Sequence, residues 1–280
     1  MIGSICSMPG VSDSQIKSSS VVRSGRRRRL LVAHLFLAVL VLLDCDENHS
    51  EPDQLYGPTP ISDYLLGDFE PARHPSFVNV SELGIRTMGR TIYLRAEAAE
   101  ALTRLIAAFH SDHPDVDLWL VSGTRNFAAQ QSIWDGKWSG QRPVEGQRLN
   151  QSVPDPRQRA LKILEYSSMP GTSRHHWGTD FDINLLQNDY YRRGPGLEIY
   201  EWLVENAPAF GFCQPYTSGR SGGYQEERWH WSFLPLSRIY LQDWNDRVAA
   251  DYPGRHRFAG VDAAADLAPV YVNTINSDCQ

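Results

Sequence analysis

The sequence predicts an α+β domain that combines short strands with amphipathic helices. Two observations predict the strands, because polar and apolar residues alternate with a period of two at residues 180–184 and again at 229–233. A third observation predicts the helices, since apolar residues in several other segments recur at helical spacing. If the two strands lie side by side, Asp182 of the first and His230 of the second can point to the same place.

The residues around these strands predict a zinc site. We expect His175, Asp182 and His230 to be its ligands, with Glu227 as the base beside a bound water. Three protein ligands and one open position are typical of catalytic zinc, whereas structural sites use all four positions. His175 and Asp182 are too far apart to share one turn of helix, which excludes the helical His-Glu-x-x-His arrangement. Gly178 lies between them, where a reversing chain needs a residue that tolerates unusual dihedral angles.

Neighbouring residues compete for some of these roles. His176 would be the ligand if the preceding segment were shifted by one residue, and Glu226 could replace Glu227 as the base. Only Glu227 has the three-residue offset from His230 that we expect. Asp180 could orient a histidine from outside the ligand shell or could be a solvated strand residue, and both possibilities stay open.

The helices and loops follow in order from local pattern. Leu102, Leu105 and Phe109 share one face of a predicted helix at 96–110, which ends before Pro114. Apolar residues 116–121 predict a strand. Further helices are expected at 128–138, 155–166, 198–207 and 235–249, separated by a surface loop at 139–153, a turn at 169–172, a polar loop at 187–196 and a Gly/Ser-rich turn at 218–223.

The N-terminus and the net charge limit the possible functions. An arginine cluster precedes an apolar run, residues 30–43, which is too short to span a bilayer comfortably and is typical of a secretory signal. Residues 1–44 contain six of the 27 basic and two of the 33 acidic residues, so the remaining 21 basic and 31 acidic residues give a net charge of −10. Such a domain is repelled by nucleic acid, and nucleic-acid binding is not expected.

The four predicted regions are a leader (1–44), a tether with an irregular segment (45–85), the zinc domain (86–247) and a C-terminal tail (248–280). Cys45 could carry a lipid, although Asp44 before it is a poor fit; cleavage nearby and an uncleaved anchor are the alternatives. Each outcome places the domain outside the cytoplasm, in the periplasm or cell envelope. Cys213 and Cys279 could pair in an oxidising compartment or stay free.

Three stretches in this order resemble one family. They are Ser122-Gly-Thr-Arg125 with Gln130, Ser173-x-His175-x-x-Gly178-x-x-x-Asp182, and Glu227-x-Trp229-His230. Together they resemble the VanY-type D-alanyl-D-alanine carboxypeptidases, zinc peptidases that trim bacterial cell-wall stem peptides, and the resemblance covers about residues 86–235. It implies the fold shared with lysostaphin-type endopeptidases and the hedgehog signalling domain, a small antiparallel sheet that carries zinc and is flanked by helices.

The resemblance also implies roles for single residues. Arg125 and Gln130 match residues that hold the C-terminal end of the substrate, and Ser173 matches a residue that lines the same pocket. Trp229 is either a core residue or the floor of that pocket. Thr124 stands where a Tyr is more usual, and positions 177, 179 and 180 carry Trp, Thr and Asp in place of smaller or apolar residues. These departures put the fine substrate preference in doubt.

The sequence therefore predicts a secreted or membrane-tethered zinc D,D-carboxypeptidase that acts on peptidoglycan stem peptides. One alternative is an L,D-carboxypeptidase that acts on the shortened tetrapeptide stem. Another is a zinc-bearing, catalytically silent domain that binds cell-wall peptides, although such a domain has no use for Glu227 as a base. We expect a monomer, with no nucleic-acid partner and with membrane contact only through an N-terminal anchor or lipid.

Overall fold

The computed structural model describes residues 52–255 and 257–280, so the predicted leader and Cys45 lie outside the described residues. These described residues belong to one folded unit. Among the described helices, none combines the length and the apolar character needed to cross a bilayer.

The central element is a four-stranded sheet in which every neighbouring pair is antiparallel, in the order β3-β4-β6-β5. This confirms the predicted antiparallel sheet. Its strands are β3 (Leu120–Ser122), β4 (Asp180–Ile183), β5 (Phe212–Cys213) and β6 (His230–Phe233). A separate antiparallel pair consists of β1 (Phe77–Asn79) and β2 (Tyr93–Arg95). The strand predicted at residues 116–121 starts later, at Leu120.

The pairing of β4 with β6 decides which side chains share a face. Asp182 pairs with His230 and Asp180 with Ser232, while Phe181 pairs with Trp231 between them. Successive side chains of a strand point to opposite faces, so one face is polar and the other apolar, as predicted. All residues of both strands are buried, however, because other parts of the chain also cover the polar face.

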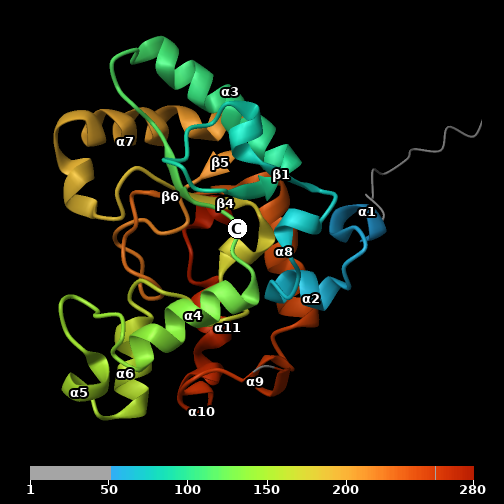
Figure 1. The fold of residues 1–280 in the computed structure, drawn as a ribbon, viewed down its shortest axis with the longest axis vertical. Helices are drawn as coiled ribbons and strands as arrows, with labels where there is room; N and C mark the ends of the chain where they lie inside the picture. Colours follow the sequence, from blue (N-terminus) through green and yellow to red (C-terminus); the bar gives the residue numbers. More distant parts are fainter. Residues whose placement is uncertain (1–51, 256) are drawn as a thin grey trace, which may run out of the picture. The chain divides into compact units, whose positions relative to one another are not determined.

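Helices cover the sheet on both sides. In Figure 1, α3 and α7 lie on one side of the sheet and α4, α6 and α11 on the other. The helices are α1 (Pro52–Tyr56), α2 (Ile61–Leu66), α3 (Ala96–Asp112), α4 (Phe127–Trp138), α5 (Leu149–Ser152), α6 (Pro156–Ile163), α7 (Gly194–Asn206), α8 (Leu234–Arg247), α9 (Tyr252–Arg255), α10 (Val261–Ala264) and α11 (Ala268–Asn273). Short 3-10 turns connect them: η1 (Pro71–Arg73), η2 (Val80–Leu83), η3 (Arg174–Trp177), η4 (Asn188–Arg192), η5 (Ala207–Phe210), η6 (Ala265–Leu267) and η7 (Ser277–Cys279).

Two apolar clusters form the core. Phe181 and Trp231 pack with Leu102 of α3 and Ile199 of α7 in one cluster, behind the apolar face of the sheet. The second cluster joins α2, α4, α6, α8 and the C-terminal helices, and it contains Trp177 of η3. The polar strand face therefore lies within a scaffold that is packed on both sides.

Local capping explains where the helices near the site begin. The Asn126 side chain accepts a hydrogen bond from the amide of Ala129 (2.9 Å) at the start of α4. Asp155 caps α6 in the same way, and Pro156 occupies the first turn as predicted. Gly178 ends η3 with φ of +75°, and a Cβ there would lie 2.3 Å from Phe77, so both the turn and the packing require glycine.

The segments expected as an irregular stretch and a tail are part of the folded unit. Tyr64 of α2 and Tyr252 of α9 are buried in the second cluster. Cys279 of η7 forms a disulfide with Cys213 of β5, which resolves the open question of their pairing. The helices here contain only four to six residues, less than two turns, so their apolar residues repeat too few times to stand out in the sequence.

Candidate active site

Three buried residues from three different elements meet at the polar face of the sheet. His175 lies in η3, Asp182 in β4 and His230 in β6, and one ligand atom from each lies within 4.8 Å of the others. The two strand residues meet because they are register partners. The structure thus brings together the three residues that the sequence predicts as metal ligands.

Hydrogen bonds orient the two imidazole rings toward Asp182. His175 Nδ1 donates to the carbonyl of Gly123 (2.8 Å), which leaves Nε2 facing the Asp182 carboxylate at 3.4 Å. His230 Nε2 lies 2.9 Å from an Asp180 oxygen, and its Nδ1 lies 2.9 Å from Asp182. Each ring therefore uses one nitrogen for an outer partner and points the other toward the carboxylate, as metal-ligating histidines do.

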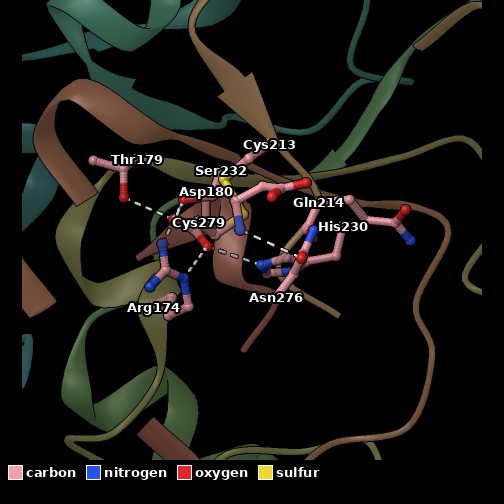
Figure 2. The surroundings of a disulfide bond; sticks show 10 residues. Arg174, Thr179, Asp180, Cys213, Gln214, His230, Ser232, Asn276 and Cys279 are labelled. Carbon is pink, nitrogen blue, oxygen red and sulfur yellow. Dashed lines mark hydrogen bonds and ion pairs between the residues drawn. A yellow bond between two sulfur atoms is a disulfide. The ribbon is translucent and has the colours of Figure 1, made fainter. Parts of the chain in front are cut away.

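Asp180 is the outer carboxylate of this arrangement, and Figure 2 shows the Arg174 and His230 side chains directed at it. It also accepts hydrogen bonds from the hydroxyls of Thr179 (2.7 Å) and Ser232 (2.7 Å). Burial alone would raise its pKa, but the charge of Arg174 and the hydrogen bond from His230 outweigh burial and hold the pKa well below its usual range. Asp180 thus orients a histidine and is not a solvated strand residue.

The electrostatics of this group favour a bound cation. Burial and the nearby Arg125 charge lower the pKa of His175, so its imidazole is neutral, as a metal ligand must be. Burial also lowers the pKa of His230, yet hydrogen bonds to Asp180 and Asp182 outweigh it and raise the value to about 9. The two carboxylates thus stabilise a positive charge at His230, which is a proton in the metal-free protein and would be replaced by the metal ion. Two imidazoles and a carboxylate are suitable ligands for zinc, so the residues present fit that ion.

His176 and Glu226 are excluded from the group by their own contacts. His176 Nδ1 donates to the carbonyl of Arg125 (2.7 Å), and its Nε2 accepts from the amide of Gly171 (3.0 Å). Glu226 forms an ion pair with Arg228 (3.1 Å) and does not line the cavity.

Glu227 points into a cavity that adjoins the three candidate ligands. The cavity has a volume of about 640 Å³ and is also lined by His175, Asp182 and His230. A Glu227 carboxylate oxygen lies 3.8 Å from His230 Nδ1. Burial raises the pKa of Glu227 to about 8, near neutral pH, where a carboxyl group can both accept and donate a proton.

Arg125 and Gln130 line the same cavity and have unused hydrogen-bonding capacity. Arg125 Nη1 donates to the Ser122 hydroxyl (3.1 Å) and lies 4.0 Å from Asp182, while its buried Nε has no hydrogen-bond partner. Gln130 Nε2 donates to the Ser168 carbonyl (2.7 Å), and its buried Oε1 has no partner. Both side chains can therefore take a further ligand group.

The two remaining predicted residues differ in their placement. Trp229 lines the cavity next to Glu227. Ser173 is 1% exposed and is not among the cavity-lining residues; its hydroxyl has no hydrogen-bond partner. Contact of Ser173 with a substrate thus stays a prediction that depends on rearrangement of its surroundings.

Lys137 and Tyr216 line the cavity but were missed by sequence reasoning. The Tyr216 ring lies 4.7 Å from that of His230 between centroids, in a segment without periodicity. Lys137 follows Gln130 by seven residues on α4, which places both on one face of the helix. That spacing is the signal by which the sequence could have identified Lys137.

The sequence profile of one family, VanY, described as D-alanyl-D-alanine carboxypeptidase, matches residues 91–236, about half of the chain. An uncharacterised protein of Haemophilus influenzae is 35% identical over 89 residues, which cover 27% of this chain and 68% of that protein. A D-alanyl-D-alanine carboxypeptidase of Enterococcus faecalis is 31% identical over 128 residues, 44% of this chain. That match spans 43% of the enterococcal protein, less than half of its length.

The solved structures to which this chain is similar include two peptidases. The LdcB L,D-carboxypeptidase is 23% identical, with a TM-score of 0.45 over 63% of this chain and 76% of its own. A VanY D,D-pentapeptidase from a VanB-type vancomycin-resistance cassette, solved with Zn(II), is 25% identical, with a TM-score of 0.41 over 56% of this chain and 83% of its own.

Proposed function

Because the chain belongs to the VanY family of D-alanyl-D-alanine carboxypeptidases, we propose that it removes the terminal D-alanine from peptidoglycan stem peptides. The observation that carries this proposal is the shared cavity, which brings Glu227, Arg125 and the three candidate ligands together. A buried carboxyl, a guanidinium and a metal site in one cavity are the groups that a metallo-carboxypeptidase needs.

His175, Asp182 and His230 would hold a zinc ion in this enzyme. When bound, zinc supplies Lewis-acid polarisation and lowers the pKa of water to about 7. Asp180 and the Gly123 carbonyl keep the outer ring nitrogens of the histidines occupied, so that the inner ones stay available as ligands.

Glu227 acts as the proton carrier in the proposed reaction. Its carboxylate accepts a proton from the attacking water and then donates it to the amine of the departing D-alanine. Hydrogen bonds fix the backbone from which this side chain extends, since the Glu227 amide donates to the Tyr216 carbonyl (2.9 Å) and the Gln214 side chain donates to the Glu227 carbonyl (3.1 Å).

Arg125 binds the terminal carboxylate of the peptide. A guanidinium can pair with a carboxylate through two parallel hydrogen bonds, and the unpartnered Arg125 Nε provides one of the donors. Since only a chain end carries that carboxylate, this contact favours removal of a terminal residue over internal cleavage. Gln130 supplies a neighbouring acceptor through its free Oε1.

The enzyme works outside the cytoplasm in this proposal, as a monomer that is secreted or tethered through the segment before residue 52. The disulfide between Cys213 and Cys279 supports an oxidising compartment. Nucleic acid is not a partner, and membrane contact occurs only through an N-terminal anchor or lipid.

Incubation of the purified protein with a stem pentapeptide and a stem tetrapeptide, with and without a chelator, tests the proposal. We expect the protein to release one D-alanine from the pentapeptide, and we expect this activity to disappear after chelation. Cleavage of the tetrapeptide alone would instead establish the L,D-carboxypeptidase alternative, which the same residues can support. Binding of both peptides without release from either would contradict catalysis and indicate a binding domain.

A further inference from the structure

Three cationic side chains line the cavity, and Lys137 differs from the other two. Arg192 pairs with Asp189 at 3.4 Å, and Arg125 lies 4.0 Å from Asp182. Among the residues that the structure describes, no carboxylate lies within ion-pair distance of Lys137, whose ammonium donates to the hydroxyl of Ser167. Lys137 thus has no ion pair among the described residues, and its anionic neighbour in the cavity is Glu227, which acts on it only from beyond ion-pair distance.

The position of Lys137 is unfavourable for an unpaired charge. It lies in the last turn of α4, partly buried against the cavity wall. Burial lowers the pKa of its ammonium group, and the more distant Glu227 charge offsets that effect only in part. A charge that is removed from water needs an opposite charge or strong hydrogen bonds to compensate. A ligand in the cavity that carries an anionic group would supply that compensation.

The helix sets the distance between this cation and the proposed binding place of the peptide end. Gln130 and Lys137 are seven residues apart on α4, so both face the cavity and are separated by about 10 Å along the axis. An extended peptide advances about 3.3–3.6 Å per residue. A peptide that lies along α4, with its end at Arg125 and Gln130, would therefore bring a residue roughly three positions before that end opposite Lys137.

We propose that Lys137 is a specificity residue that binds a second free carboxylate of the stem peptide, upstream of the scissile bond. This inference rests on the proposed function and adds a feature of the substrate. Two groups of a stem peptide could supply the carboxylate. One is the side chain of a diaminopimelate at the third position, and the other is the α-carboxylate of a γ-linked glutamate at the second.

Four pentapeptides distinguish these sources: diaminopimelate or lysine at the third position, each combined with glutamate or its amide at the second. For wild-type protein we expect kcat/KM to fall about tenfold when the recognised carboxylate is removed, as for loss of a charge-assisted hydrogen bond. In the Lys137→Gln variant the same change of peptide should leave kcat/KM nearly unaltered, while Lys137→Arg should retain much of the preference.

Lys162→Gln is the matched control, because Lys162 pairs with Glu145 and Glu165 and does not line the cavity. It should keep the wild-type preference. The proposal is overturned if wild-type protein treats all four peptides alike, or if Lys137→Gln lowers kcat/KM equally for all four, since that pattern indicates a structural role.

A binding measurement separates failure of this proposal from failure of the proposed function. If no peptide is cleaved, the proposed function is wrong, but the affinities of the four peptides for a Glu227→Gln protein still test Lys137. We expect the peptide with the recognised carboxylate to bind about tenfold more tightly than its neutral counterpart, and the difference to vanish when Lys137→Gln is added. Equal affinities in the presence of Lys137 would contradict the inference.

Discussion

Replacement of Cys279 by serine should destabilise the whole domain, although this residue is next to the last in the chain. Its partner, Cys213, is 66 residues away in sequence, so the bond closes a long loop in the unfolded chain. In the chain-entropy description, cross-linking a loop of this length stabilises the folded state by about 4 kcal/mol at 25 °C. That is a large fraction of the roughly 5–15 kcal/mol by which domains are stable.

The bond also holds the C-terminal segment against the part of the chain that carries Glu227. Asn276 donates through its amide to the Pro215 carbonyl (2.8 Å) and through its side chain to the Gln214 carbonyl (3.3 Å). The Gln214 side chain in turn donates to the Glu227 carbonyl. Figure 2 shows Gln214 and Asn276 beside the two cysteines. We therefore expect Cys279→Ser to reduce turnover as well as stability.

Urea unfolding followed by tryptophan fluorescence measures the effect, at one fixed zinc concentration because a bound metal shifts stability. Cys279→Ser and Cys213→Ser should each lower the unfolding free energy by about 4 kcal/mol, and the double variant by little more, because either change removes the same bond. Wild-type protein in reductant should match the variants. A single variant within about 1 kcal/mol of wild type would refute the reasoning.

Four further predictions concern the candidate active site. Glu227→Gln should retain bound zinc and lose about 10²–10⁴-fold in kcat, and a near-normal rate would remove Glu227 from the mechanism. Arg125→Ala should raise KM strongly; unchanged kinetics would show that it does not bind the terminal carboxylate. Asp180→Asn should weaken zinc binding by about 10–100-fold in a chelator competition, because it removes the carboxylate that orients His230. In metal-free protein the pKa values of Glu227 and His230, about 8 and about 9, lie above their unfolded values near 4.5 and 6.5, so the folded state binds more protons. The melting temperature of the metal-free protein should therefore fall as the pH rises from 6.5 to 9, because the folded state loses these extra protons. Calorimetry should find a shallower fall in Glu227→Gln, and no fall at all if both groups have their ordinary pKa values.

Some of the site could be predicted because it depends on short-range spacing. The alternation around Asp182 and around His230 identifies two strands, and antiparallel pairing of such strands then brings the two residues together. Glu227 follows from its offset to His230, whereas the roles of Arg125 and Gln130 were implied by the family resemblance, and the structure places both side chains at the cavity. Local pattern was enough for Asp182 and His230 because both lie in regular strands, whereas the family spacing was needed to choose His175 over His176.

Only the tertiary structure decided the features that depend on contacts between distant segments. Asp180 orients His230 because Arg174 and Ser232 converge on its carboxylate, and no local pattern distinguishes this from a solvated strand residue. The spacing of Lys137 from Gln130 places both on one helix face, but only the tertiary structure shows that this face lines the cavity. The C-terminal helices are too short for a repeated apolar pattern to stand out, and their place is set by packing and by Cys279. By itself the sequence determined the local elements and the metal-binding residues that they carry. The burial and charge partners of those residues were decided by the fold, because both depend on which remote segments pack together.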